Sequence, residues 1–186
     1  MLNYQILTDE PIQMSKMQER LSHQNLIAET NVMMDTLHDL LKDANDADVV
    51  FQPVDTQRAA LEGETAHGWT LAHIISHTTA TGEEAAAIGS ILARGVEVSG
   101  RCRYETPWEA ITTFDQLMQR LEESRRIRLG YLNSWPDDPH LDKLIPFERL
   151  LQKHGPLNCV GFTLFGLHHD SEHLAQIAEI MRQARQ

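Results

Sequence analysis

The sequence predicts an all-α domain, a four-helix bundle with long crossover connections. Four long segments carry apolar residues at intervals of three and four, the spacing that places them on one face of an α-helix. No segment shows a clear period-two alternation typical of a β-strand, and no internal repeat is present. With 186 residues, the chain is expected to form a single domain over 1–186 around one core.

The first helix is expected from Pro11 or Ser15 to Ala44. Ser15 and Gln18 have the spacing of a capping box. The stretch 45–68 is predicted to be irregular, because an Asn and Asp cluster stops the helix and Pro53 favours an extended residue before it. The apolar stripe that predicts the helix consists of Met14, Met17, Leu21, Ala28, Val32, Leu37, Leu40, Leu41 and Ala44.

The second helix is expected from Thr70 to Ala93, with Thr70 as its N-cap and Gly95 directly after its end. The segment 96–107, which contains Gly100 and Pro107, is too long for a tight hairpin. It therefore predicts a crossover that permits the third helix to return parallel to the second.

The third helix is expected to start at Thr112 or Thr113 and to end near Asn133. Its apolar stripe is interrupted by Arg125 and Arg128, and two explanations stay open. These arginines lie on a solvated flank, or one of them turns inward to hold an anionic substrate.

A short helix over 147–154 and a last helix over 156–184 complete the chain. Gly155 ends the short helix, and Pro156 is suited to the first turn of the next. Gly161 and Gly166 lie inside the last helix, where each glycine costs about 1 kcal/mol relative to alanine. They predict a close helix contact or a kink just before a group of histidines.

The last helix carries the most informative chemical pattern. His169 and His173 are four residues apart, which puts both imidazoles on one helical face and makes a two-point clamp for a metal. A catalytic metal site usually takes three protein ligands and keeps one open position. His73, close to the start of the second helix, is the best candidate for the third ligand.

Two neighbouring residues have open roles. His77 lies one turn after His73. Three roles are open for it: a fourth metal ligand, a proton shuttle, or a neighbour of the site without a function in it. Glu172 is a candidate general base, or an acceptor for the hydrogen bond of a ligand. A solvated surface charge is its more ordinary explanation.

Composition excludes several function classes. The formal net charge of −11 repels phosphates and anionic lipid surfaces, so neither nucleic acid nor a membrane is expected as a partner. Cys102 and Cys159 lack metal-ligand spacing and are expected to be free thiols of a reducing compartment. The absence of a signal-peptide pattern and of an apolar run long enough to span a membrane predicts a cytoplasmic protein.

The motifs WTLAHI at 69–74 and HDSEHLAQI at 169–177, with a helical stretch like 114–132 between them, resemble the DinB/YfiT-like superfamily. All three elements occur in the order of that family and cover most of the chain. The resemblance implies a four-helix bundle in which His73, His169 and His173 bind a divalent metal. It also implies relatives that are chiefly thiol-dependent transferases and isomerases, and a homodimer.

Three neutral imidazoles suit a divalent transition metal such as Zn, Ni or Fe. They leave the cation its full charge, so a thiol or water bound there loses its proton near neutral pH. We expect a metal-dependent transferase that uses a low-molecular-weight thiol, or a hydrolase, acting on a small-molecule electrophile. The alternative is a non-catalytic bundle that binds a small ligand or a structural metal. The histidine pattern fits both, so whether the protein is an enzyme stays open at this stage.

Overall fold

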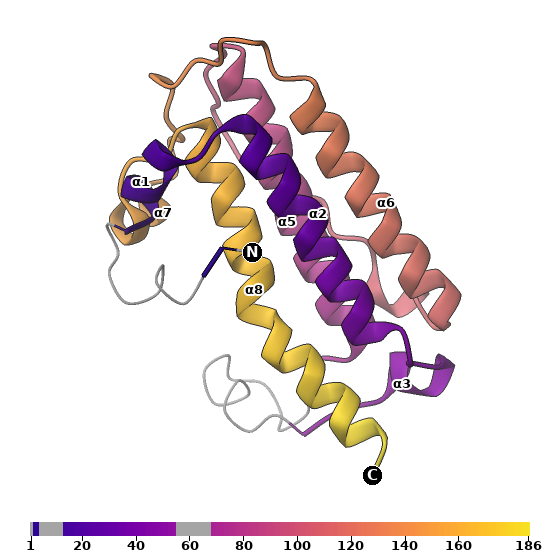
Figure 1. Cartoon of the computed structure of the whole chain (residues 1–186). Helices are drawn as coiled ribbons and strands as arrows, with labels where there is room; N and C mark the ends of the chain where they lie inside the picture. Colours follow the sequence, from indigo (N-terminus) through magenta and orange to yellow (C-terminus); the bar gives the residue numbers. More distant parts are fainter. Residues whose placement is uncertain (1, 4–12, 55–67) are drawn as a thin grey trace.

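The computed structural model describes residues 2–3, 13–54 and 68–186. Its long helices are α2 (His23–Leu41), α5 (Leu71–Ala93), α6 (Phe114–Asn133) and α8 (Cys159–Ala184). They lie side by side as a four-helix bundle (Figure 1). The described part of the chain contains no β-strand, which confirms the predicted all-α class.

The order of the helices around the bundle places α5 between α6 and α8, and α2 against those same two helices on the other side. Figure 1 shows that α5 and α6 run in one direction, whereas α2 and α8 run in the other. The segment 94–113 connects the end of α5 to the start of α6 and returns along the length of the bundle (Figure 1). The predicted crossover and its parallel return are therefore confirmed.

The prediction of one helix from Pro11 or Ser15 to Ala44 is wrong in its continuity. The chain forms a short helix α1 (Gln13–Met17) and a 3-10 turn η2 (Gln18–Arg20) before α2 begins. Ser22 caps α2, because its Oγ accepts from the Asn25 backbone N–H at 3.2 Å while the Asn25 side chain accepts from the Ser22 N–H at 2.9 Å. This capping box starts a new helix inside the apolar stripe. Pro11 lies outside the described residues.

The other helix ends are close to those predicted. Thr70 and Thr113 cap α5 and α6, and Gly95 follows α5 with a φ of +79°. The last helix begins at Cys159 instead of Pro156, because the Asn158 side chain accepts from two backbone N–H groups there. Three short helices complete the described chain: α3 (Asp46–Val50) in the stretch predicted to be irregular, η3 (Trp108–Ala110) and α7 (Glu148–His154).

Glycines bring α5 and α8 close together beside the histidines. A Cβ at Gly166 would lie 2.6 Å from the Ala85 Cβ and 3.3 Å from the Gly82 Cα, so the close contact predicted at Gly166 is confirmed. A Cβ at Gly82 would lie 2.0 Å from the Cζ of Arg128. Gly82 therefore leaves the space that an arginine of α6 occupies inside the bundle.

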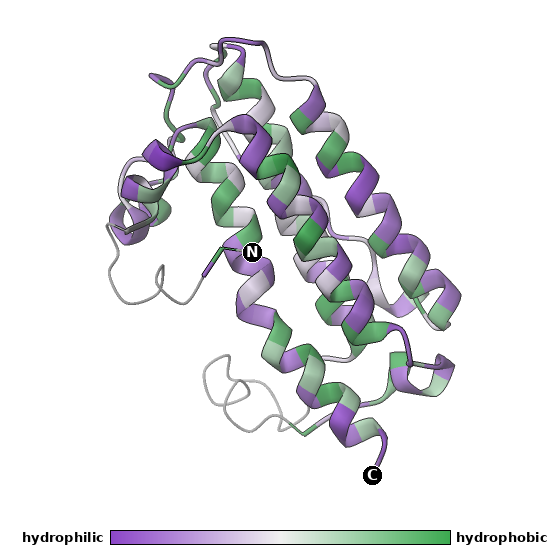
Figure 2. Cartoon of the chain, viewed as in Figure 1, coloured by the Kyte–Doolittle hydropathy of each residue, from purple (hydrophilic) through white to green (hydrophobic). Residues whose placement is uncertain are grey.

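The core lies between the four helices, and Figure 2 shows hydrophobic and hydrophilic residues alternating along α2, α6 and α8. This banding is expected of helices with one buried face. Fully buried apolar side chains come from every long helix and include Leu37, Ile75, Leu121 and Ile177. None of the helices in the described ranges combines the length and apolar character that a membrane span requires.

Candidate metal centre

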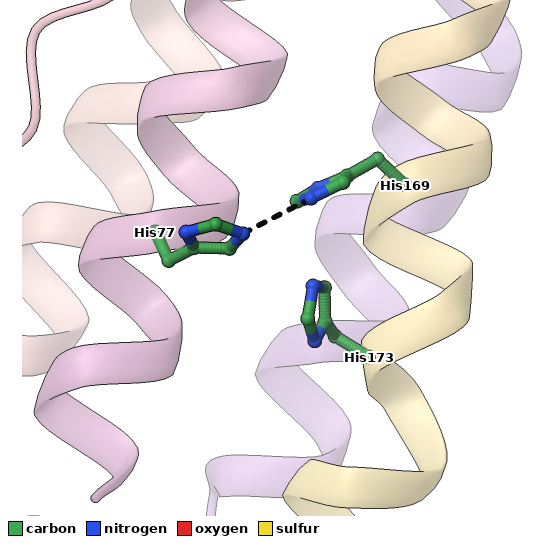
Figure 3. Close-up of side chains that lie close together, drawn as sticks. All are labelled: His77, His169 and His173. Carbon is green, nitrogen blue, oxygen red and sulfur yellow. Dashed lines mark hydrogen bonds between the residues drawn. The ribbon is translucent and has the colours of Figure 1, made fainter. Parts of the chain in front are cut away.

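Three histidines meet between α5 and α8. His77 projects from α5, and His169 and His173 project from α8 (Figure 3). One ring nitrogen of each lies within 4.8 Å of the other two, and His77 Nε2 is 3.1 Å from His169 Nε2. Among the described residues these three form the group that could hold a metal ion.

The antiparallel course of α5 and α8 explains how distant parts of the sequence reach one place. His77 lies in the second turn of α5, whereas His169 and His173 lie on either side of the middle of α8. The two helices run in opposite directions (Figure 1), and the second turn of α5 lies level with the middle of α8. The i,i+4 spacing then turns both α8 imidazoles toward α5.

His73, predicted as the third ligand, is not part of this group. Its ring stacks on Trp69 with centroids 4.3 Å apart and on Trp108 with centroids 5.0 Å apart. His77, predicted as an additional ligand or proton shuttle, lies beside the α8 pair instead. The two α5 histidines are one turn apart on the same side of the helix, so sequence spacing alone did not separate them.

Trp69 borders the three-histidine group as well as His73. Its ring centroid is 4.7 Å from that of His77 and 6.2 Å from that of His173. The indole therefore covers two of the three imidazoles with an apolar surface. Such a wall limits the access of water and strengthens electrostatic interactions inside the site.

His173 is oriented by the next turn of its own helix. Its Nδ1 lies 3.0 Å from Gln176 Oε1. An amide oxygen only accepts hydrogen bonds, so Nδ1 carries the proton and Nε2 carries the lone pair. A metal-binding imidazole takes this tautomer, with its second nitrogen donating to a neighbouring acceptor.

The pKa of the His169 imidazole lies far below its ordinary value. Burial, with the nearby His173, His77 and Arg103 as smaller contributions, lowers its pKa to about 2. The ring is therefore neutral at pH 7, as metal ligation requires. Its Nδ1 is buried and has no hydrogen-bond partner among the described residues. Neutral imidazoles with buried nitrogens fit a divalent transition metal.

The crossover contributes two residues that sequence analysis did not single out. An Arg103 guanidinium nitrogen, Nη2, lies 3.0 Å from His77 Nδ1 and 2.5 Å from Glu105 Oε2. Glu105 Oε2 is 3.8 Å from the same His77 nitrogen. Both are loop residues of ordinary type without a motif. The only feature of the sequence that could have indicated their role is the length of the crossover, which is sufficient for the chain to pass beside the histidines.

Arg128 and Arg125, the predicted alternatives for holding a substrate, differ in placement. Arg128 is turned inward and donates to Asp170, to Ser124 Oγ at 3.1 Å and to the Thr78 carbonyl at 3.2 Å. Arg125 pairs with the exposed Asp35 at 2.7 Å. The inward arginine thus binds a carboxylate of its own chain, and an anionic substrate at either residue stays a prediction.

Glu172 lies beside the group and not in it. Its Oε2 is 3.6 Å from Nδ1 of the buried His168, and its side chain is 40% exposed. His168 faces His154 across a centroid distance of 6.3 Å. The role of Glu172 as a general base, or as the acceptor of a hydrogen bond from a metal-binding histidine, stays a prediction.

A family comparison agrees with the fold. The model of the DinB superfamily matches residues 30–177, a range that contains His77, His169 and His173. No curated protein and no solved structure matches the chain.

Proposed function

The chain belongs to the DinB superfamily, and on this premise we propose that it is a metal-dependent enzyme in which a small thiol or water attacks a small-molecule electrophile. The observation that supports this most is the convergence of His77, His169 and His173 on one point between two helices. Three protein ligands are the usual number in a catalytic zinc site, because one position stays open for the reactant. Zn, Ni or Fe is the proposed metal.

When bound, such a cation supplies Lewis-acid chemistry that favours loss of a proton from a thiol or water. The chain's own residues prepare the place for it. Gln176 fixes the tautomer of His173, and burial keeps His169 neutral. Trp69 shields the rings of His77 and His173 from water.

The nucleophile is proposed to come from outside the chain. Cys102 and Cys159 are both free thiols, and Cys159 is buried. Burial raises the pKa of Cys159 to about 11, and burial with the nearby Glu84 raises that of Cys102. Neither thiol is therefore activated as a thiolate near pH 7. This supports a low-molecular-weight thiol or water as the attacking group.

The experiment starts from protein purified without a metal-affinity column and measures its metal content. Metal-loaded parent and His169→Ala protein are then assayed with bacillithiol, mycothiol, glutathione, cysteine and water against a chromogenic electrophile. We expect metal-dependent turnover with at least one nucleophile in the parent and its loss in the variant. Equal rates for both proteins with every nucleophile would refute the proposed enzymatic activity.

A second candidate is a metal that only stabilises the bundle. It is favoured by one observation: the three histidines come from α5 and α8, so a bound metal would cross-link two helices. This candidate predicts that chelation lowers the melting temperature while no nucleophile in the panel gives turnover.

A homodimer is also proposed, and it rests on the family resemblance. Light scattering of the purified protein tests it, because one chain has a mass of 21.2 kDa. A species of twice that mass at micromolar concentration is expected, and a species of single-chain mass would refute the dimer.

A further inference from the structure

His77 Nδ1 faces two side chains of the crossover that have opposite hydrogen-bonding character. An arginine only donates hydrogen bonds, so the Arg103 contact at 3.0 Å makes His77 Nδ1 an acceptor. The proton of the neutral ring is then on Nε2. That nitrogen lies 3.1 Å from Nε2 of His169 on α8. In this state the His77 Nε2–H donates to His169.

Metal ligation requires the opposite tautomer of His77. A metal takes the lone pair of Nε2, so the proton of the neutral ring moves to Nδ1. Nδ1–H and the Arg103 N–H would then be two donors facing each other. A metal-binding histidine almost always donates its other N–H to a carboxylate, a carbonyl or water. The carboxylate of Glu105, at 3.8 Å, lies next to the nitrogen that needs such an acceptor.

We propose that Glu105 is the positioning residue for His77 in the metal-bound protein, where it replaces Arg103 as the hydrogen-bond partner of His77 Nδ1. The inference rests on the proposed metal site and adds the group that selects the ligand tautomer. Arg103 holds the metal-free tautomer and Glu105 holds the metal-binding one. The crossover thereby takes part in the site, although it supplies no ligand.

The surroundings of the two residues allow this exchange. The side chains of Arg103 and Glu105 are each 27% exposed and lie outside the helices. A shortening of about 1 Å brings Glu105 Oε2 from 3.8 Å to hydrogen-bond distance. Arg103 keeps two anchors when it releases Nδ1, because its Nε donates to Thr81 Oγ1 at 3.2 Å and its Nη2 donates to the His77 carbonyl at 3.3 Å.

The first test measures Zn²⁺ affinity by competition with a chromogenic chelator. Glu105→Ala is expected to weaken binding about 10- to 100-fold, the usual effect of losing the partner of a metal-binding histidine. Glu105→Gln keeps an acceptor oxygen without the charge, so its loss should be smaller. Glu109→Ala is the matched control, because it removes the same charge from an exposed position on the same crossover.

Parent protein that binds no Zn²⁺ would overturn the proposed metal site itself. Parent that binds Zn²⁺ while both Glu105 variants match it in affinity would overturn the role of Glu105 alone. An equal loss in Glu109→Ala would also overturn that role, because the effect would then be one of net charge. Should Glu105→Ala fail to fold, Glu105→Gln still decides the point.

The second test observes the tautomer directly by ¹⁵N NMR of the His77 ring. The proton is expected on Nε2 in metal-free protein and on Nδ1 in Zn²⁺-loaded protein. In loaded Glu105→Ala protein the Nδ1–H signal should broaden or disappear through exchange with water. A His77 Nδ1 without a proton in the loaded parent would overturn the inference.

Discussion

Arg128 of α6 and Asp170 of α8 form an ion pair inside the bundle, with side chains that are 3% and 0% exposed. Asp170 directly follows His169, so the pair fixes α8 at the residue next to a candidate metal ligand. Gly82 of α5 provides the space for the guanidinium. One arginine thus connects three of the four long helices at the level of the site.

Arg128→Met should lower the free energy of unfolding by about 3–5 kcal/mol, because it leaves the Asp170 carboxylate buried and unpaired. Arg125→Met is the matched control on the same helix. Its partner Asp35 is 66% exposed, so a loss of about 0–1 kcal/mol is expected. Urea denaturation measures both, and equal losses would contradict the buried pair.

Metal content should separate the two α5 histidines. His77→Ala, His169→Ala and His173→Ala should each lose stoichiometric metal, whereas His73→Ala should keep it, because only the first three rings converge. Elemental analysis of purified protein gives the result. Loss of metal in His73→Ala together with its retention in His77→Ala would restore the ligand set inferred from sequence.

Gly166→Ala should destabilise the protein by about 1–3 kcal/mol, because the added methyl overlaps Ala85 and approaches Gly82 across the α5–α8 contact. Gly130→Ala is the control. A Cβ there has no neighbour within 4 Å, so replacing this helical glycine by alanine should raise the free energy of unfolding by up to about 1 kcal/mol. Equal effects in denaturation curves would show that α8 does not depend on this close approach.

Stability should fall as the pH drops from about 6.5 to 4. Burial lowers the pKa of His154 to about 4 and that of His168 to about 4. Below the ordinary histidine pKa of about 6.5 the unfolded chain therefore binds protons that the folded protein does not. Each histidine contributes at most about 1.4 kcal/mol per pH unit to this loss.

His154→Gln should flatten that slope, as measured by urea denaturation at several pH values between 7 and 4.5. His38→Gln serves as control, because the His38 side chain is exposed in the folded protein. A slope that is the same in the parent and in His154→Gln would mean that the buried His154 takes up its proton without unfolding.

The fold was predictable because helix signals are local. Thr70 before α5 and Gly95 after it are caps that act within one turn, and the structure places both as predicted. The break at Ser22 was missed because it interrupts an apolar stripe that continues through it. There the capping box with Asn25 outweighs the periodicity.

The site was predictable only for the part that lies within one helix. The spacing of His169 and His173 fixes their relation, because both belong to α8. The choice between His73 and His77 depends on the offset of α5 relative to α8 along the bundle axis, and no local sequence pattern determines that offset. Arg103 and Glu105 depend on the path of a loop, which the sequence constrains even less.

The antiparallel contact of α5 and α8 has a consequence for the timing of assembly. His77 and His169 are 92 residues apart in sequence, and two of the three imidazoles lie on α8. α5 is synthesised before α8, so the nascent chain holds a single imidazole of the group while the 92 residues from His77 to His169 are made. Metal capture can follow only when α8 has docked, which would make the bound ion a marker of a completed bundle.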